Sequence, residues 1–164
     1  MNSYQEGLEI LDGILGQGKD NIIALATISL ELSERGNPQP CVRDVDAYYE
    51  EGVFYIVTYA LSNKVFKVSR NPEVSIAADF EDFSSCGIAE NLGWVLDPKN
   101  ADIRTKLRTI FKEWYDFANN EEDPNFCFVA IRLTKGTLRL DHGQRIYRFD
   151  FENKTAESFE QSVY

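Results

Sequence analysis

The sequence predicts a mainly β protein with helices, an α+β fold in which antiparallel strands close into a barrel. Runs of β-branched and aromatic residues recur along the chain, and glycine, proline and asparagine turns separate them. Two segments with helical periodicity lie far apart instead of alternating with the strands. A parallel sheet needs a long crossover between strands, so this pattern favours hairpins and a barrel of about six to eight strands.

Composition limits the partners of the chain. Its 164 residues are 43% apolar, which suits a single domain, residues 1–164, with a substantial core. The formal charge of −10 argues against binding to nucleic acid or to an anionic membrane surface, because both require a basic footprint. Residues 1–20 lack the pattern of a signal peptide, so we expect a cytoplasmic protein. Three isolated cysteines and one histidine form no zinc motif.

The first half of the chain predicts one helix and three strands. Leucines and isoleucines at helical spacing predict an amphipathic helix at residues 4–15, and a dense apolar run predicts a buried strand at residues 21–32. Pro38 and Pro40 restrict the next pairing to an edge or a bend. Strands are then expected at residues 41–49 and 53–59, joined by a turn at Glu50-Glu51-Gly52.

The second half predicts further strands and a second long helix. A short helix beginning near Lys64 stops at Asn71-Pro72. Asp97 and Pro98 are expected to cap and open the long helix, whose apolar spacing continues through Trp114. The predicted strands are residues 73–80, residues 86–96 with bends at Gly87 and Gly93, residues 126–136, and one or two more around a turn at residues 141–143, before a polar, loosely ordered tail after Asp150.

Two cations and a hydroxyl fall at neighbouring places in this scheme. Arg43 lies on the second strand, while Ser62 and Lys64 lie between the end of the third strand and the start of the short helix. A helix start offers free N–H groups and the positive end of the helix dipole, so this arrangement suits a phosphate. Each residue also has a simpler explanation. Arg43 can pair with a surface acid, Lys64 can extend along the surface, and Ser62 can act as the N-cap.

The order of the motifs resembles the pyridoxamine 5′-phosphate oxidase-like family of FMN-binding split barrels. The resemblance covers about residues 21–140. Its motifs are A-L-A-T at 24–27, P-x-V-R-x-V at 40–45, the tyrosine pair at 48–49, F-Y-I-V-T at 54–58, S-N-K-V at 62–65, R-N-P-E-V-S at 70–75, G-I-A-E at 87–90, the Asp97-Pro98 helix start and E-W-Y at 113–115. The resemblance implies a split β-barrel.

The resemblance also implies a cofactor and a set of contacts. Two chains would pair, with FMN in the groove between them, and Trp94 or Trp114 would approach the partner's flavin without an assigned role. The implied cofactor contacts are Arg43 and Lys64 on the phosphate, Ser62 and Asn63 in support, Asp44 and Val45 along the isoalloxazine through backbone groups, and Thr58 and Tyr59 beside the cofactor.

The function implied is redox chemistry on a small molecule by flavin hydride transfer, with a nicotinamide electron donor. No catalytic acid or base stands out in the sequence. The chain ends without the arginine- and histidine-containing substrate motif of authentic pyridoxamine phosphate oxidases, which argues against that substrate. Two alternatives stay open: a barrel that carries flavin or another ligand without turnover, and a haem-handling relative. In the latter, His142 is the only histidine available as an axial ligand.

Overall fold

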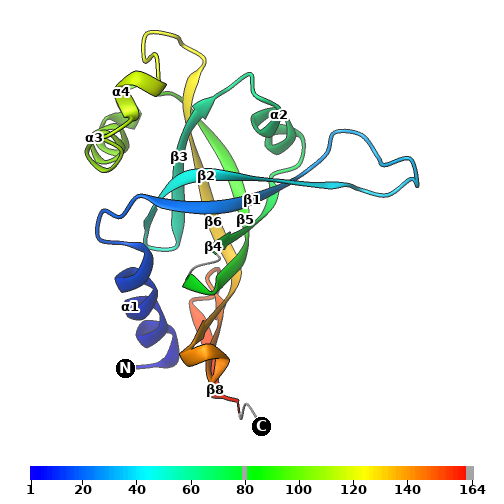
Figure 1. Cartoon of the computed structure of the whole chain (residues 1–164), viewed down its shortest axis with the longest axis vertical. Helices are drawn as coiled ribbons and strands as arrows, with labels where there is room; N and C mark the ends of the chain where they lie inside the picture. Colours follow the sequence, from blue (N-terminus) through cyan, green and yellow to red (C-terminus); the bar gives the residue numbers. More distant parts are fainter. Residues whose placement is uncertain (79–80, 162–164) are drawn as a thin grey trace.

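The computed structural model describes residues 1–78 and 81–161. Its eight strands form one antiparallel sheet in the order β3-β2-β1-β4-β5-β6-β7-β8, and an additional pairing of β3 with β6 closes the first six strands into a barrel (Figure 1). The elements are α1 (Ser3–Leu15), β1 (Asn21–Ile28), β2 (Pro40–Glu50), β3 (Val53–Tyr59), α2 (Asn63–Arg70), β4 (Glu73–Ala78), β5 (Phe83–Trp94), η2 (Pro98–Asn100), α3 (Ala101–Ile110), α4 (Tyr115–Ala118), β6 (Phe126–Leu140), η3 (Asp141–Gly143), β7 (Arg145–Asp150) and β8 (Thr155–Glu160).

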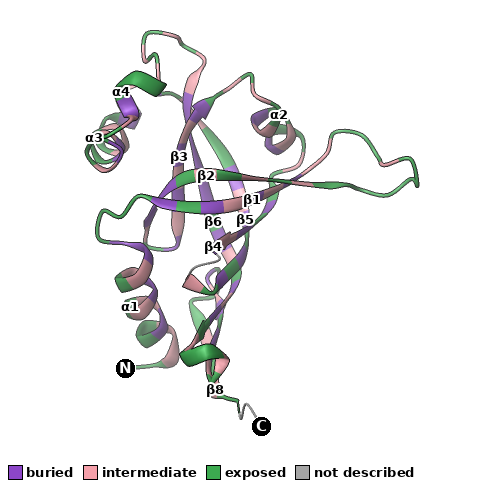
Figure 2. Ribbon diagram, in the orientation of Figure 1, coloured by how far each residue is buried: buried purple, intermediate pink, exposed green. Residues whose placement is uncertain are grey.

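The barrel interior holds the main hydrophobic core. Along the barrel strands buried residues alternate with less buried ones (Figure 2), which places every second side chain in the barrel interior. Ile23, Phe54 and Ile131 are fully buried there. A second, smaller cluster lies under α3 and α4 and includes Leu107 and Phe128. The prediction of an antiparallel barrel within a mainly β fold is therefore confirmed.

The N-terminal helix packs against the strands that extend beyond the barrel. Asn2 and Gln5 form a capping box that starts α1. The helix then lies against β7, where the Tyr147 hydroxyl donates to Glu6 Oε1 at 2.7 Å. Gly7 permits this close contact, because a Cβ at that position would lie 2.7 Å from Cε1 of Phe149.

A carboxylate network fixes the loop between α4 and β6. Both Nε and Nη2 of Arg104 donate to the Glu121 carboxylate, at 2.9 and 2.7 Å, and Nη1 of Arg108 lies 3.2 Å from it. The Tyr115 hydroxyl donates to the same group at 3.1 Å. The Arg104 hydrogen bonds hold the pKa of Glu121 below its usual range. The side chain of Glu121 is only 17% exposed, so this network anchors α3 to the loop.

Several predicted strands have different bounds in the structure, and β6 continues past Gly136 to Leu140. The first strand ends at Ile28 rather than Leu32, because Ile28 faces Pro40, which has no N–H to continue the ladder. The chain then forms an exposed arm, residues 29–39 (Figures 1 and 2). β5 begins at Phe83 rather than Cys86. The register shifts expected near Gly87 and Gly93 are present. The fourth strand is confirmed over Glu73–Ala78, and residues 79–80 lie outside the described residues.

Two predictions were wrong, one about the second long helix and one about the C-terminal tail. The second long helix is interrupted. Asp97 does accept from the Lys99 N–H as a cap, but α3 ends at Ile110. There the Trp114 ring stacks on Phe111 at 4.6 Å and donates to Asp20 Oδ2, contacts that a continuous helix would not provide. The tail after Asp150 is not loose, because β8 pairs with β7 along six residues.

Candidate functional site

The residues predicted to bind a phosphate lie close together beside the N-terminus of α2, at one end of the barrel. Arg43 projects from β2 on the same side as the inward-facing Val45, while Ser62 and Lys64 lie at the start of α2. Lys64 is half-buried, and its pKa is lowered first by burial and then by the nearby Arg43 guanidinium. Two cations thus share one partly desolvated place, which is unfavourable unless an anion lies between them.

Two buried polar atoms at this place have no hydrogen-bond partner among the described residues. They are Nε of Arg43 and Oγ of Ser62. Ser62 occupies the N-cap position of α2 with extended backbone, yet its side chain makes no capping hydrogen bond. Buried polar groups are normally paired, because an unpaired one costs roughly 1–3 kcal/mol. Both atoms therefore point to a ligand that accepts hydrogen bonds.

The cations around α2 also lack carboxylate partners. Ten of the seventeen lysines and arginines lie within 4.0 Å of a carboxylate in the described structure. Among the cations without such a partner, four lie on β2 or α2: Arg43, Lys64, Lys67 and Arg70. In a chain with a formal charge of −10, the unpaired Arg43 and Lys64 mark this end of the barrel for an anion, whereas Lys67 and Arg70 lie in the last turn of α2.

An open strand edge borders the same place. β2 pairs with β3 only at residues 48–50, although it pairs with β1 from residue 40 to residue 47. The edge of β2 that faces away from β1 therefore has no strand partner over residues 40–47 within the described chain. Every second residue on such an edge offers a free N–H and C=O. Asp44 and Val45 lie in this segment, and because backbone groups alternate in direction along a strand, one of the two presents its N–H and C=O to the open edge, where a flat ligand can contact them.

The remaining predicted contacts divide into buried and exposed residues. Thr58 is buried near the end of β3, whereas Tyr59 is 37% exposed, with its ring 5.5 Å from that of Phe126. The side chains of Asp44 and Asn63 are exposed. Asp44 alternates with Arg43 and so faces away from it, which leaves only its backbone for the site.

Sequence reasoning missed one residue of the site. Cys127 pairs directly with Thr58 across β3 and β6 and lies close enough to Lys64 for the ammonium charge to act on its thiol. Burial raises the pKa of the Cys127 thiol to about 11, so it stays protonated at neutral pH. No local signal reveals this neighbour, because Thr58 and Cys127 are separated by most of the barrel in sequence.

The other candidate residues lie elsewhere. Trp94 is 36% exposed and donates from Nε1 to the Glu121 carbonyl, and Trp114 packs on the second core cluster. His142 is exposed in the turn between β6 and β7, which Figure 1 places at the opposite end of the molecule from α2.

Comparisons with known proteins were made for both sequence and structure. The sequence matches no protein-family model and no curated protein. Solved structures do match. A pyridoxamine 5′-phosphate oxidase-related, FMN-binding protein from Nostoc punctiforme has a TM-score of 0.60 at 14% identity, covering 99% of this chain and 98% of its own. This chain has the split-barrel fold.

Two further split barrels show the range of proteins with this architecture. General Stress Protein 26 from Bacillus anthracis has a TM-score of 0.57 at 18% identity, covering 94% of this chain and 98% of its own. A heme binding protein from Mycobacterium smegmatis has a TM-score of 0.54 at 16% identity, covering 85% of this chain and 57% of its own. At such identities the likeness establishes the fold, and the function must be argued from the site.

Proposed function

We propose that this split barrel binds FMN and transfers hydride between the flavin and a small molecule. The observation that carries the proposal is the pair of buried, unpartnered atoms, Nε of Arg43 and Oγ of Ser62, beside the half-buried Lys64. A flavin phosphate supplies the negative charge and the acceptor oxygens that this arrangement lacks. The Nostoc punctiforme protein, which is described as FMN-binding, supports the choice of cofactor.

The residues divide into a phosphate end and a ring end. Arg43 and Lys64 bind the phosphate, with the Ser62 hydroxyl donating to it and Asn63 placed at the first turn of α2. The open edge of β2 at residues 44–45 contacts the isoalloxazine through backbone groups, and Thr58 and Tyr59 flank the cofactor.

The protein's part in the reaction is to hold the cofactor and control access to it. Bound flavin supplies hydride-transfer chemistry, and a nicotinamide dinucleotide is the proposed electron donor. The chain's own residues fix the phosphate and present one edge of β2 to the ring. Neither role needs a side chain that acts as an acid or base.

We further propose a cytoplasmic homodimer. On the outward face of β1 and β2, Ile22 is 66% exposed and Val42 is 68% exposed, which favours burial against a second copy. Cys41, Cys86 and Cys127 are all free thiols, as expected in a reducing compartment. No helix in the described residues is long and apolar enough to cross a membrane. Light scattering during gel filtration tests the dimer, and a monomeric mass would refute it.

The cofactor is tested by the visible spectrum of the purified protein, followed by denaturation and mass measurement of any released chromophore. Arg43→Ala with Lys64→Ala removes two charged contacts and should weaken FMN binding on the order of 100-fold or more. The control is Arg70→Ala at the far end of the same helix, which should keep its flavin. FMN retention by the folded double variant would refute the assigned site.

The alternatives predict different spectra. A flavin carrier would be yellow but would not bleach with a nicotinamide donor. A haem protein, the function suggested by the Mycobacterium smegmatis neighbour, would show a Soret band that His142→Ala weakens. The exposed position of His142, away from α2, favours the flavin proposal.

A further inference from the structure

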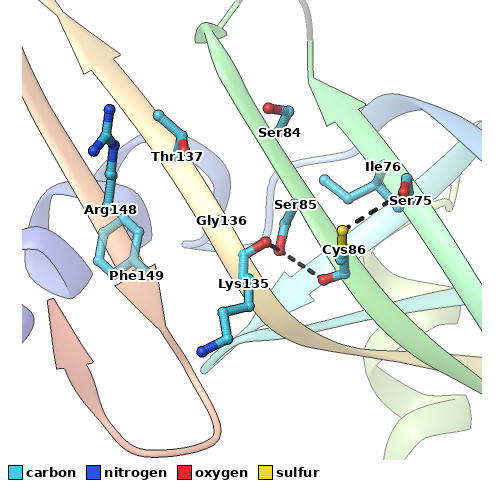
Figure 3. A pocket seen from close by; sticks show the side chains of 10 residues that line it. All are labelled: Ser75, Ile76, Ser84, Ser85, Cys86, Lys135, Gly136, Thr137, Arg148 and Phe149. Carbon is cyan, nitrogen blue, oxygen red and sulfur yellow. Dashed lines mark hydrogen bonds between the residues drawn. The ribbon is translucent and has the colours of Figure 1, made fainter.

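A cavity lies on the solvent-facing side of the sheet, across β4, β5, β6 and β7. Its volume is about 390 Å³. Figure 3 shows its lining side chains on neighbouring strands, short ones such as Ser84 and Thr137 together with the longer Arg148. The lining residues are Ser75, Ile76, Ser84, Ser85, Cys86, Lys135, Gly136, Thr137, Arg148 and Phe149. None of them belongs to the candidate site around Arg43 and Lys64, so the cavity is a separate place on the molecule.

Strand register aligns three hydrogen-bond donors along one wall of this cavity. Ser84 pairs directly with Thr137, and Thr137 pairs directly with Arg148. Residues that face each other across antiparallel strands have Cβ atoms about 5 Å apart and share one face of the sheet. Figure 3 shows the three side chains extending from β5, β6 and β7 in a row. Two hydroxyls and a guanidinium thus converge on one region, a donor set suited to an oxyanion.

The Arg148 guanidinium is available for such a ligand. Its Cζ lies 4.7 Å from the centroid of the Phe159 ring, which holds the side chain in place without neutralising it. Glu157 is its register partner on β8, but no carboxylate of the described residues lies within 4.0 Å of it.

The other polar groups of the cavity already have partners. Lys135 pairs with Asp150, so neither charge is left over to attract or repel a ligand. The Ser85 hydroxyl donates to backbone carbonyls of Cys86 and Lys135, where it holds the irregular register between β5 and β6. Ser84 and Thr137 make no side-chain hydrogen bond in the described structure, which leaves their hydroxyls free for a ligand.

We propose that this cavity binds a small molecule through an oxyanion group, either a phosphate or a carboxylate, held by Arg148, Thr137 and Ser84. The volume accommodates the anionic group with several further heavy atoms, and the exposed thiol of Cys86 lines another part of the cavity. The site is separate from the proposed flavin site at Arg43, Ser62 and Lys64.

The test is an NMR titration of the isotope-labelled full chain with inorganic phosphate and, separately, with acetate, at constant ionic strength. Binding should shift the backbone amides of Ser84, Gly136 and Thr137, and those shifts give a dissociation constant for this cavity alone. Amides at residues 62–64 report separately on the flavin pocket. Tighter binding of phosphate identifies a phosphate-bearing ligand, and tighter binding of acetate a carboxylate.

Substitutions test whether Ser84, Thr137 and Arg148 bind the anion. Arg148→Gln should weaken binding roughly tenfold or more, and Ser84→Ala with Thr137→Val, which keeps Arg148, should weaken it roughly threefold to tenfold or more. The matched control is Arg139→Gln, since Arg139 lies on the same face of β6 but pairs with Asp82 at 3.7 Å. The proposal is overturned if the cavity amides do not shift, or if Arg148→Gln binds as tightly as the control.

Discussion

Replacing Ser62 with alanine should change the stability and the cofactor affinity in opposite senses. An N-cap serine normally stabilises its helix by about 1 kcal/mol through a capping hydrogen bond. The Ser62 hydroxyl makes no such bond, so its removal should not destabilise the helix in this way. The same hydroxyl is buried without a partner, and removing an unsatisfied group relieves roughly 1 kcal/mol. The flavin-free Ser62→Ala protein should therefore be more stable by up to about 1 kcal/mol, or about 2–4 °C in Tm.

FMN binding should weaken in the same variant, because the hydroxyl is assigned to donate to the phosphate. Loss of one such hydrogen bond to a charged phosphate costs roughly 1.5–3 kcal/mol, about tenfold to 150-fold in Kd. Urea unfolding of the flavin-free protein measures the first quantity, and calorimetric titration with FMN measures the second. Ser69→Ala is the control on the same helix, since its exposed hydroxyl donates to the Phe66 carbonyl at 2.9 Å. The reasoning would be refuted if Ser62→Ala lowered the free energy of unfolding of the flavin-free protein by about 1 kcal/mol. It would also be refuted if the variant bound FMN as tightly as the wild-type protein.

Other predictions concern packing and pH. Gly7→Ala should destabilise the protein by about 1–2 kcal/mol in urea unfolding, because the new methyl group meets Phe149, whereas Gly13→Ala on the same helix has nothing within 4 Å and should stabilise it by about 0.5–1 kcal/mol. Glu121→Gln should cost about 2 kcal/mol at pH 7, since it leaves Arg104 without its charged partner. Because the pKa of Glu121 is lowered on folding, its contribution is complete above the ordinary value of 4.5 and is lost as the pH falls through the folded value. Stability of the variant should thus depend less on pH below about 5, and equal acid sensitivity in both proteins would contradict this assignment.

Local patterns in the sequence were sufficient for much of the fold. β3 has the predicted bounds Val53–Tyr59, because its alternation and its flanking turns are contained within about ten residues. Asp97 was recognised as a cap for the same reason. The residue types at the phosphate end could also be predicted, since strand alternation and the start of α2 are both local features.

Contacts between distant segments decided the rest. Thr155–Glu160 is polar and carries no strong strand signal, yet it forms β8 because β7 offers a free edge for pairing. α3 stops at Ile110 although apolar spacing continues, because Trp114 gains contacts with Phe111 and Asp20.

The sequence by itself determined most of the strands and helices and which cations and hydroxyls are available. Only the tertiary structure decided that Arg43 and Ser62 keep unpaired buried atoms beside Lys64, that β2 and β3 separate to leave an open edge, and that Ser84, Thr137 and Arg148 align. The physical reason is that burial and hydrogen-bond satisfaction depend on register between strands far apart in the chain, which no local pattern specifies.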